Sequence, residues 1–157
     1  MSMKIFTLTK EQILPISVEA AWEFFSNPNN LNKITPKDMS FEIRTELEGE
    51  MYAGMLIDYT VKPILNIPMA WTTEITHVKK GEYFIDEQRF GPYKLWHHEH
   101  HFEKTKHGVL ITDKLLYGLS FGLIGNALNS LFISRRIQEI FDFRYDKLNE
   151  LFPKMVK

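Results

Sequence analysis

The sequence predicts a single α+β domain, in which a curved antiparallel sheet of seven strands packs against one long C-terminal helix, with two short helices after the first strand. Three observations lead to this prediction. Stretches with strand character follow one another with brief turns between them, as in an antiparallel meander. A long segment of helical periodicity closes the chain. A length of 157 residues, without a linker or an internal repeat, suits one domain over residues 1–157.

The N-terminal third contains a strand followed by two short helices. Residues 3–14 are expected to form the first strand, which Pro15 ends. Ser17 is a favourable N-cap residue, and apolar residues follow it at helical spacing up to Phe25. Asn27-Pro28 stops this helix. A second short helical turn is predicted over 29–34.

The middle of the chain consists of strands, and a long helix ends it. Turns are predicted at Lys80-Gly81, Gly91-Pro92 and His107-Gly108. The long helix is expected over about 124–152, before Pro153. The remaining six strands are predicted at 39–47, 55–65, 67–78, 82–90, 95–104 and 108–117.

Composition excludes several classes of function. Charged residues make up 25% of the chain and the net charge is −1, which argues against a nucleic-acid binder that works through a basic surface. The chain has no Cys, which removes disulfide scaffolds, thiol nucleophiles and Cys-ligated zinc or iron–sulfur sites. The 12 Phe, 6 Tyr and 3 Trp are numerous and call for an explanation.

Targeting signals are not evident. Residues 1–20 contain no apolar core of a secretory signal peptide. The uncharged stretch 115–134 is long enough to cross a bilayer, but it contains Asn, Ser and Gly and is unevenly apolar. We therefore expect a cytoplasmic protein without stable membrane insertion.

Alternation along the strands predicts a polar row on the inner face of the sheet. Pairing the hairpins about their turns places Asp86 opposite His100, and His100 opposite Asp113. The same register pairs Gln88 with His98 one step away. Buried charges persist when they are paired and hydrogen-bonded, so the imidazoles are the natural partners of the carboxylates. Thr73 lies at one end of the row.

The long helix has an apolar stripe that changes sides. Arg144 lies within the stripe of the C-terminal half, whereas Leu128, Leu131 and Phe132 point the other way in the N-terminal half. Either the helix bends or shifts register near Ser134, or an apolar patch faces outward. An outward patch would serve a dimer partner, a membrane surface or a ligand gate.

Four segments carry a resemblance to known proteins. They are AWEFFSNPNNLNKITP (21–36), FIDEQRFGPYKLWHHEHHF (84–102), the strand with Asp113 and Tyr117, and IFDFRYDKL (140–148). Together they resemble the START/Bet v 1-like (SRPBCC) superfamily, which has the helix-grip fold, and in particular its bacterial stand-alone polyketide cyclase/coenzyme Q-binding-like group. The resemblance covers nearly the whole chain. It implies a mostly apolar cavity between sheet and long helix, but no particular reaction.

With this resemblance, the rings and polar groups of the inner face are interpreted as the wall of a ligand cavity, since pockets are commonly lined in this way. The expected function is binding, transport or sequestration of a small hydrophobic molecule such as a lipid, a quinone or a polyketide, without a cofactor. The expected ligand-binding residues are Trp71, Thr73, Phe84, Asp86, Gln88, Phe90, Trp96, His98, His100, Phe102, Asp113, Tyr117 and Arg144.

Other interpretations remain open. His100 with Asp86 and Asp113 suits acid–base catalysis of a cyclase or dehydratase type. His98 and His100 beside two carboxylates also resemble part of a metal site, although two ligands at i and i+2 are a partial signal, and a hydrogen-bonded row without metal is favoured. The third alternative is a regulatory interaction protein that uses the patch of Leu128, Leu131 and Phe132. A homodimer through the N-terminal half of the long helix is one arrangement that this patch would allow.

Overall fold

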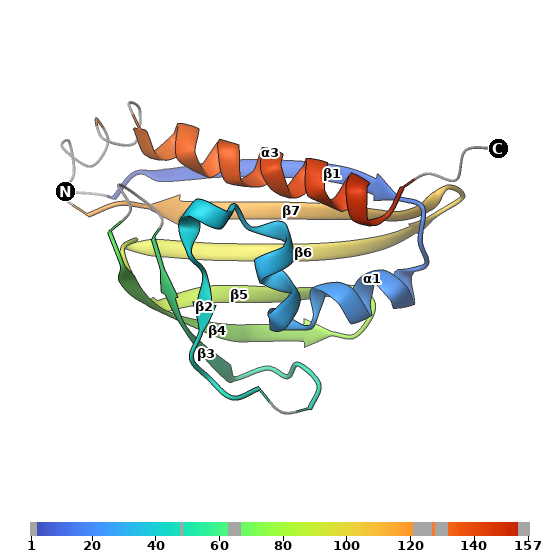
Figure 1. The fold of residues 1–157 in the computed structure, drawn as a ribbon, viewed down its shortest axis with the longest axis horizontal. Helices are drawn as coiled ribbons and strands as arrows, with labels where there is room; N and C mark the ends of the chain where they lie inside the picture. The colour runs from blue at the N-terminus through green and yellow to red at the C-terminus, as the bar shows by residue number, and fades with distance from the viewer. Residues whose placement is uncertain (1–2, 48, 63–66, 121–126, 128–131, 154–157) are drawn as a thin grey trace.

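In the computed structural model, residues 3–47, 49–62, 67–120, 127 and 132–153 are described. Over these residues the chain forms seven strands, two α-helices and two 3₁₀ helices (Figure 1). These elements are β1 (Ile5–Leu14), α1 (Val18–Phe25), η1 (Pro28–Ile34), η2 (Lys37–Met39), β2 (Glu42–Ile43), β3 (Met55–Val61), β4 (Met69–Lys79), β5 (Tyr83–Phe90), β6 (Leu95–Thr105), β7 (Gly108–Gly118) and α3 (Ser134–Leu151).

All described strands belong to one antiparallel sheet in the order β1-β7-β6-β5-β4-β3-β2. The strands from β2 to β7 form a meander, and β1 adds to its far end beside β7. The predicted fold class is therefore confirmed. Helices α3, α1 and η1 lie on one face of the sheet, and α3 runs along β1 and β7 (Figure 1).

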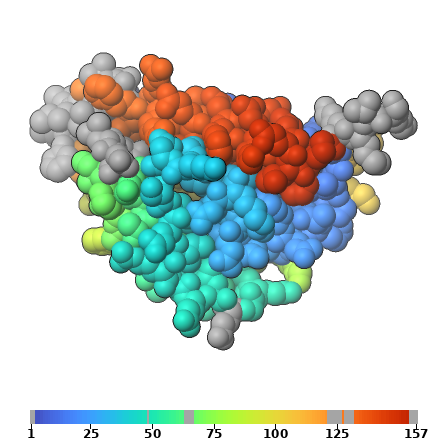
Figure 2. All heavy atoms as spheres, in the orientation of Figure 1, coloured from blue at the N-terminus to red at the C-terminus, as the bar shows by residue number. Residues whose placement is uncertain are grey.

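Local signals in the sequence account for the first helices. The Ser17 hydroxyl accepts a hydrogen bond from the backbone N–H of Ala20, 3.1 Å away, and thereby caps α1. Asn27 caps η1 through the N–H of Asn29, and Pro28 occupies the first turn of that helix. Both predicted short helices are confirmed. In the space-filling view, α3 lies directly against the segment of η1 and η2 (Figure 2).

Two of the predicted strands are clearly shorter than expected. The strand expected over 39–47 is only β2 (Glu42–Ile43), because Lys37–Met39 form η2 and Ser40 ends it with a positive φ of 43°. The strand expected over 55–65 ends at Val61, and its last predicted residues fall partly outside the described range.

The start of the long helix also differs from the expectation. Helix α3 begins at Ser134, and Phe132 and Ile133 form a wider, π-type turn just before it. Most of the residues predicted to begin the helix, Leu128 and Leu131 among them, lie outside the described residues, and Phe132 is 63% exposed. The outward patch therefore stays a prediction. No described helix is long and apolar enough to cross a membrane.

The apolar interior is divided into three clusters rather than one. The first lies beneath α1 and includes Trp22 and Phe102. The second belongs to β3 and its neighbours and includes Ile57. The third joins β7 to α3 and includes Tyr117 and Phe141. Partly buried side chains connect neighbouring clusters: Met51 and Val78 pack against the first and second, and Trp71 against the second and third.

Phe90, which the alternation places on the inner face, is 66% exposed. A bulge explains the difference: Thr73 pairs with Gln88, but the adjacent Thr72 pairs with Phe90. The extra residue in β5 reverses the alternation beyond Gln88, so that Phe90 shares the outer face with Thr72. The inward assignment of Phe90 was wrong.

Phe102 and Phe90 provide a matched test of this packing. Phe102 is 6% exposed and makes edge-to-face contacts with Trp22 and Phe25. We expect Phe102→Ala to lower the free energy of unfolding by about 3–5 kcal/mol, because a buried ring leaves a cavity. Phe90→Ala should change it by less than about 0.5 kcal/mol. Urea unfolding followed by circular dichroism measures both, and equal losses would contradict the assigned faces.

Candidate functional site

A cavity of about 160 Å³ lies between the sheet and the helices. Each of the three apolar clusters contributes to its wall, for example through Phe25, Ile57 and Phe141. The wall is completed by side chains of η1, η2, β4, β5 and β6. Side chains of all three clusters therefore face this one cavity.

Three aromatic side chains in the wall of this cavity contact one another. The ring centroids of Trp71 and Trp96 lie 5.1 Å apart in an edge-to-face arrangement, and Tyr93 contacts both at 5.5 and 4.7 Å. The indole nitrogen of Trp71 donates a hydrogen bond to the Thr73 hydroxyl, 3.1 Å away. Burial raises the pKa of Tyr93, so its phenol stays protonated.

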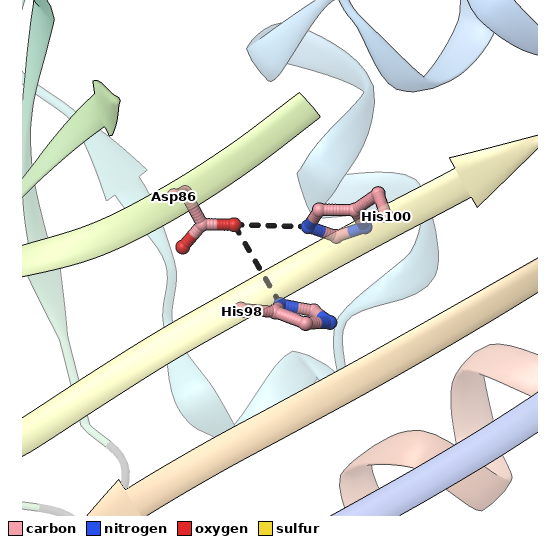
Figure 3. A group of neighbouring side chains, drawn as sticks. All are labelled: Asp86, His98 and His100. Carbon is pink, nitrogen blue, oxygen red and sulfur yellow. Dashed lines mark hydrogen bonds and ion pairs between the residues drawn. The ribbon is translucent and has the colours of Figure 1, made fainter. Parts of the chain in front are cut away.

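A cluster of charged and polar side chains interrupts the apolar wall. Asp86 projects from β5 toward His98 and His100, which lie on the same face of β6 (Figure 3). Asp113 on β7 and Arg144 on α3 complete the cluster from the other side. All five side chains are at least four-fifths buried.

Each imidazole lies between the two carboxylates. His100 Nε2 is 2.9 Å from Asp86 Oδ2, and His98 Nε2 is 3.0 Å from Asp113 Oδ1. His100 Nδ1 also lies 2.9 Å from Asp113 Oδ1, but at an angle that does not form a hydrogen bond. His98 Nδ1 is 3.6 Å from Asp86 Oδ2. The same Asp113 oxygen lies 3.7 Å from a terminal nitrogen of Arg144.

The two histidines differ in protonation. Burial lowers the pKa of His98, and the nearby His100 lowers it further, so His98 is neutral. Burial also acts to lower the pKa of His100, but the Asp113 and Asp86 carboxylates outweigh this effect and raise it. We therefore assign the positive charge of the pair to His100.

Both carboxylates are ionised despite their burial. Burial acts to raise the pKa of Asp113, but its contacts with His100 and His98 hold that pKa well below its usual range. Burial opposes ionisation of Asp86 as well, and its pKa is lowered in the same way, mainly by His100. Two negative charges on Asp86 and Asp113 are thus balanced by the positive charges of His100 and Arg144, as buried charges require.

The predicted pairing of β6 with β7 is confirmed, since His100 lies opposite Asp113. The predicted pairing of β5 with β6 was wrong by two residues: Asp86 lies opposite His98, and Phe84 opposite His100. The alternation is unchanged by a shift of two, so Asp86 still reaches His100 diagonally.

Gln88 has a different neighbour from the one expected. Its side-chain amide donates to the carbonyl oxygen of Tyr93, 2.7 Å away, and its side-chain oxygen accepts from the N–H of Tyr93. Gln88 therefore holds the loop between β5 and β6, and the Gln88–His98 pair is not formed. This loop is what carries the Tyr93 ring into the interior.

The structure brings most of the expected site residues to the cavity. Five of them do not line it: Gln88 holds the loop, Phe90 is exposed, Phe102 and Tyr117 pack in the apolar clusters, and Asp113 lies behind the two imidazoles. Those that line the cavity are Trp71, Thr73, Phe84, Asp86, Trp96, His98, His100 and Arg144.

The sequence analysis missed other wall residues. Tyr59 lies on the buried side of β3 with Met55, Ile57 and Val61, and the alternation of that strand was the signal that would have found it. Tyr93 follows the Gly91-Pro92 turn. No local signal identifies it, because residues after a turn are usually exposed.

No protein-family profile matches the chain, and no curated protein matches its sequence significantly. Solved structures do resemble it over nearly their whole lengths. Protein CV1439 from Chromobacterium violaceum has a TM-score of 0.68 at 13% identity and covers 94% of this chain and 98% of its own. Protein TTHA0849 from Thermus thermophilus has a TM-score of 0.67 at 15% identity, with 92% and 95% covered.

The major latex-like protein 151 from Panax ginseng is also similar, with a TM-score of 0.67, 15% identity and coverage of 96% and 99%. Likeness at this identity shows the fold alone. The chain therefore has the Bet v 1-like helix-grip fold, as the sequence resemblance implied.

Asp113→Asn tests the balance of buried charges. The folded-state pKa of Asp113 is depressed, so its contribution to stability is present above the unfolded pKa of about 3.9 and is lost as the pH falls toward the folded value. At pH 7 we expect the substitution to cost about 3–5 kcal/mol of unfolding free energy. Below about pH 4 the difference from wild type should shrink.

Asp142→Asn is the matched control. Asp142 pairs with Lys10 at 2.6 Å on the surface, and such exposed pairs contribute at most about 1 kcal/mol. Urea unfolding at about pH 7 and about pH 3.5, on either side of the ordinary carboxyl pKa, compares both variants with wild type. A cost at Asp113 no larger than that at Asp142 would contradict the assignment of Asp113 as a buried counter-charge.

Proposed function

We propose that the protein binds a small hydrophobic molecule in the cavity between the sheet and α3. The observation that carries this proposal is a cavity whose wall combines aromatic and aliphatic side chains with a polar cluster. Pockets for small molecules have this composition, because the apolar wall provides affinity and a few polar groups fix the orientation.

The volume favours a compact ring over a long acyl chain. An apolar cavity of about 150 Å³ in another protein takes up benzene, and the cavity described above has about 160 Å³. The rings of Trp71, Tyr93 and Trp96 offer faces and edges for contact with an aromatic ligand. The ligand class we propose is therefore a one-ring or small two-ring compound with a hydrogen-bonding oxygen, such as a quinone or a small polyketide fragment.

A substitution that fills the cavity tests this function. Ile140 on α3 lines the cavity, whereas Asp146 is exposed on the same helix. We expect Ile140→Trp to expel the ligand and Asp146→Trp, which adds the same ring outside, to retain it. In native mass spectra of the purified proteins, we expect a bound small molecule in the wild type and in Asp146→Trp, but not in Ile140→Trp.

Acetophenone provides a defined probe for protein that carries no bound molecule. It combines one aromatic ring with a carbonyl oxygen, and its binding is followed through the NMR signals of the Trp71 and Trp96 side chains. The affinity should fall at least about tenfold in Ile140→Trp, or about 1.4 kcal/mol, and stay unchanged in Asp146→Trp. A wild-type protein that carries no small molecule and shows no shift with acetophenone would refute the proposal.

Acid–base catalysis is a second candidate, and it rests on the geometry of His100. This protonated imidazole borders the cavity and lies 2.9 Å from Asp86. With a bound ketone, His100 would donate its proton to the carbonyl oxygen while Asp86 accepts a proton from the adjacent carbon, which forms an enol. The protonated Asp86 exchanges its proton with solvent and returns one to the carbon, while His100 takes back the proton of the enol oxygen, which regenerates the ketone and both side chains.

Deuterium exchange measures this step directly. In D₂O we expect the wild-type protein to exchange the methyl protons of acetophenone at least about 100-fold faster than His100→Gln, within the range that a positioned acid or base contributes. The variant should bind acetophenone within a few-fold of wild type. Equal exchange rates would leave binding alone as the function.

A further inference from the structure

The two buried imidazoles are oriented in a way that hydrogen bonding alone does not explain. His98 turns Nε2 toward Asp113 and Nδ1 toward Asp86, and His100 turns Nδ1 toward Asp113 and Nε2 toward Asp86. One ring nitrogen from each histidine and one oxygen of Asp86 therefore converge (Figure 3). We propose that Asp86, His98 and His100 bind one divalent transition-metal ion of the Zn²⁺ type.

The separations of these atoms suit a common ion. Asp86 Oδ2 lies 2.9 Å from His100 Nε2 and 3.6 Å from His98 Nδ1, and one ligand atom from each residue lies within 4.8 Å of the others. Ligands at about 2.0–2.1 Å from a tetrahedral zinc ion are about 3.3 Å apart. Small rotations of the side chains would bring all three atoms to that distance.

Asp113 faces, on both histidines, the ring nitrogen that would not bind the metal. A histidine that binds a metal through one nitrogen usually directs the other toward a carboxylate or carbonyl, which fixes the ring and its tautomer. Asp113 Oδ1 lies 3.0 Å from His98 Nε2 and 2.9 Å from His100 Nδ1. A single carboxylate oxygen thus faces the outer nitrogen of both rings.

The contact between His98 and Asp86 favours a cation between them. Nε2 of His98 forms the hydrogen bond to Asp113, 3.0 Å away. Nδ1 of the same ring lies 3.6 Å from Asp86 Oδ2, which is longer than a hydrogen bond. A positive ion between Nδ1 and this oxygen would contact both atoms favourably.

The donor set selects the class of metal. Two imidazole nitrogens and one carboxylate oxygen suit zinc, iron, cobalt or nickel, whereas calcium and magnesium prefer oxygen ligands. Three protein ligands with a vacant position are typical of reactive rather than structural zinc sites. All three residues line the cavity, so the vacant position would face a water molecule or the oxygen of a bound ligand.

The charge balance of the site favours an anionic fourth ligand. A divalent ion would bring two positive charges and Arg144 a third, against the two negative charges of Asp86 and Asp113. The remaining positive charge favours a hydroxide or an enolate oxygen as the fourth ligand. Arg144 lies 3.7 Å from Asp113 and also borders the cavity, so its positive charge would act on the fourth ligand as well.

Titration with Co²⁺ and Zn²⁺ tests the site in protein first treated with a chelator. We expect one equivalent of Co²⁺ to produce visible absorption bands of a four- or five-coordinate ion, and one equivalent of Zn²⁺ to displace it. Asp86→Asn keeps the side-chain shape and should raise the Kd for Zn²⁺ at least about 100-fold. Near-ultraviolet circular dichroism establishes that the variant is folded.

His97→Ala is the matched control. His97 lies on the same strand but on the outer face, where it pairs with Glu87 and Glu99. Its removal should leave stoichiometry and affinity unchanged. If His97→Ala weakens binding as much as Asp86→Asn does, the ion binds at the surface and the proposal is wrong.

A measurement on the wild-type protein is independent of whether the variants fold. Long-range ¹H–¹⁵N spectra resolve the six histidines of the chain. With Zn²⁺, the His98 Nδ1 and His100 Nε2 signals should shift to the range of metal-bound nitrogen, while those of His97 and His101 stay in place. No shift at His98 and His100 with excess Zn²⁺ would overturn the proposal. Acetophenone binding is measured with chelator present, so the proposed cavity function is tested separately.

Discussion

Two carboxylates are buried in the interior of this protein, and each must be neutralised by side chains from other elements of the fold. Asp113 has the most partners of the two, because one of its oxygens contacts both histidines of β6 and lies near Arg144 of α3. Unpaired, such a charge would be strongly unfavourable in the interior. The position of α3 over the sheet and the orientation of both imidazoles are therefore linked to the same carboxylate.

The cavity follows from how the apolar residues are distributed. They pack as three clusters, beneath α1, along β3 and between β7 and α3. The polar cluster lies among them, since Phe84 stacks on His100 at 4.2 Å and Phe141 meets His98 edge-on at 5.5 Å. Charged side chains cannot be covered by an apolar core without loss of hydrogen bonding. The interior thus combines an apolar space with one polar wall, which is the arrangement that binding, acid–base chemistry and metal coordination would all use.

The sequence alone was sufficient for most of the architecture. The N-cap at Ser17, the turn at His107-Gly108 and the alternation of β6 each have a local cause, and each predicted element is present in the structure. The sequence analysis favoured a hydrogen-bonded row without metal over a metal site. The orientation of the two rings, which no sequence pattern records, is the reason for proposing the metal here.

Alternation has a period of two, and this determines what the sequence can and cannot specify. It placed Trp96, His98, His100 and Phe102 on one face of β6, because the face depends only on whether a position is odd or even. A shift of two residues keeps the face, so the pairing of Asp86 with His98 was decided by the loop that Gln88 and Tyr93 hold. The bulge at Phe90, the burial of Tyr93 and the approach of Arg144 to Asp113 likewise depend on contacts between distant segments. Local pattern determined the elements and their inner faces, and only tertiary packing decided which atoms meet there.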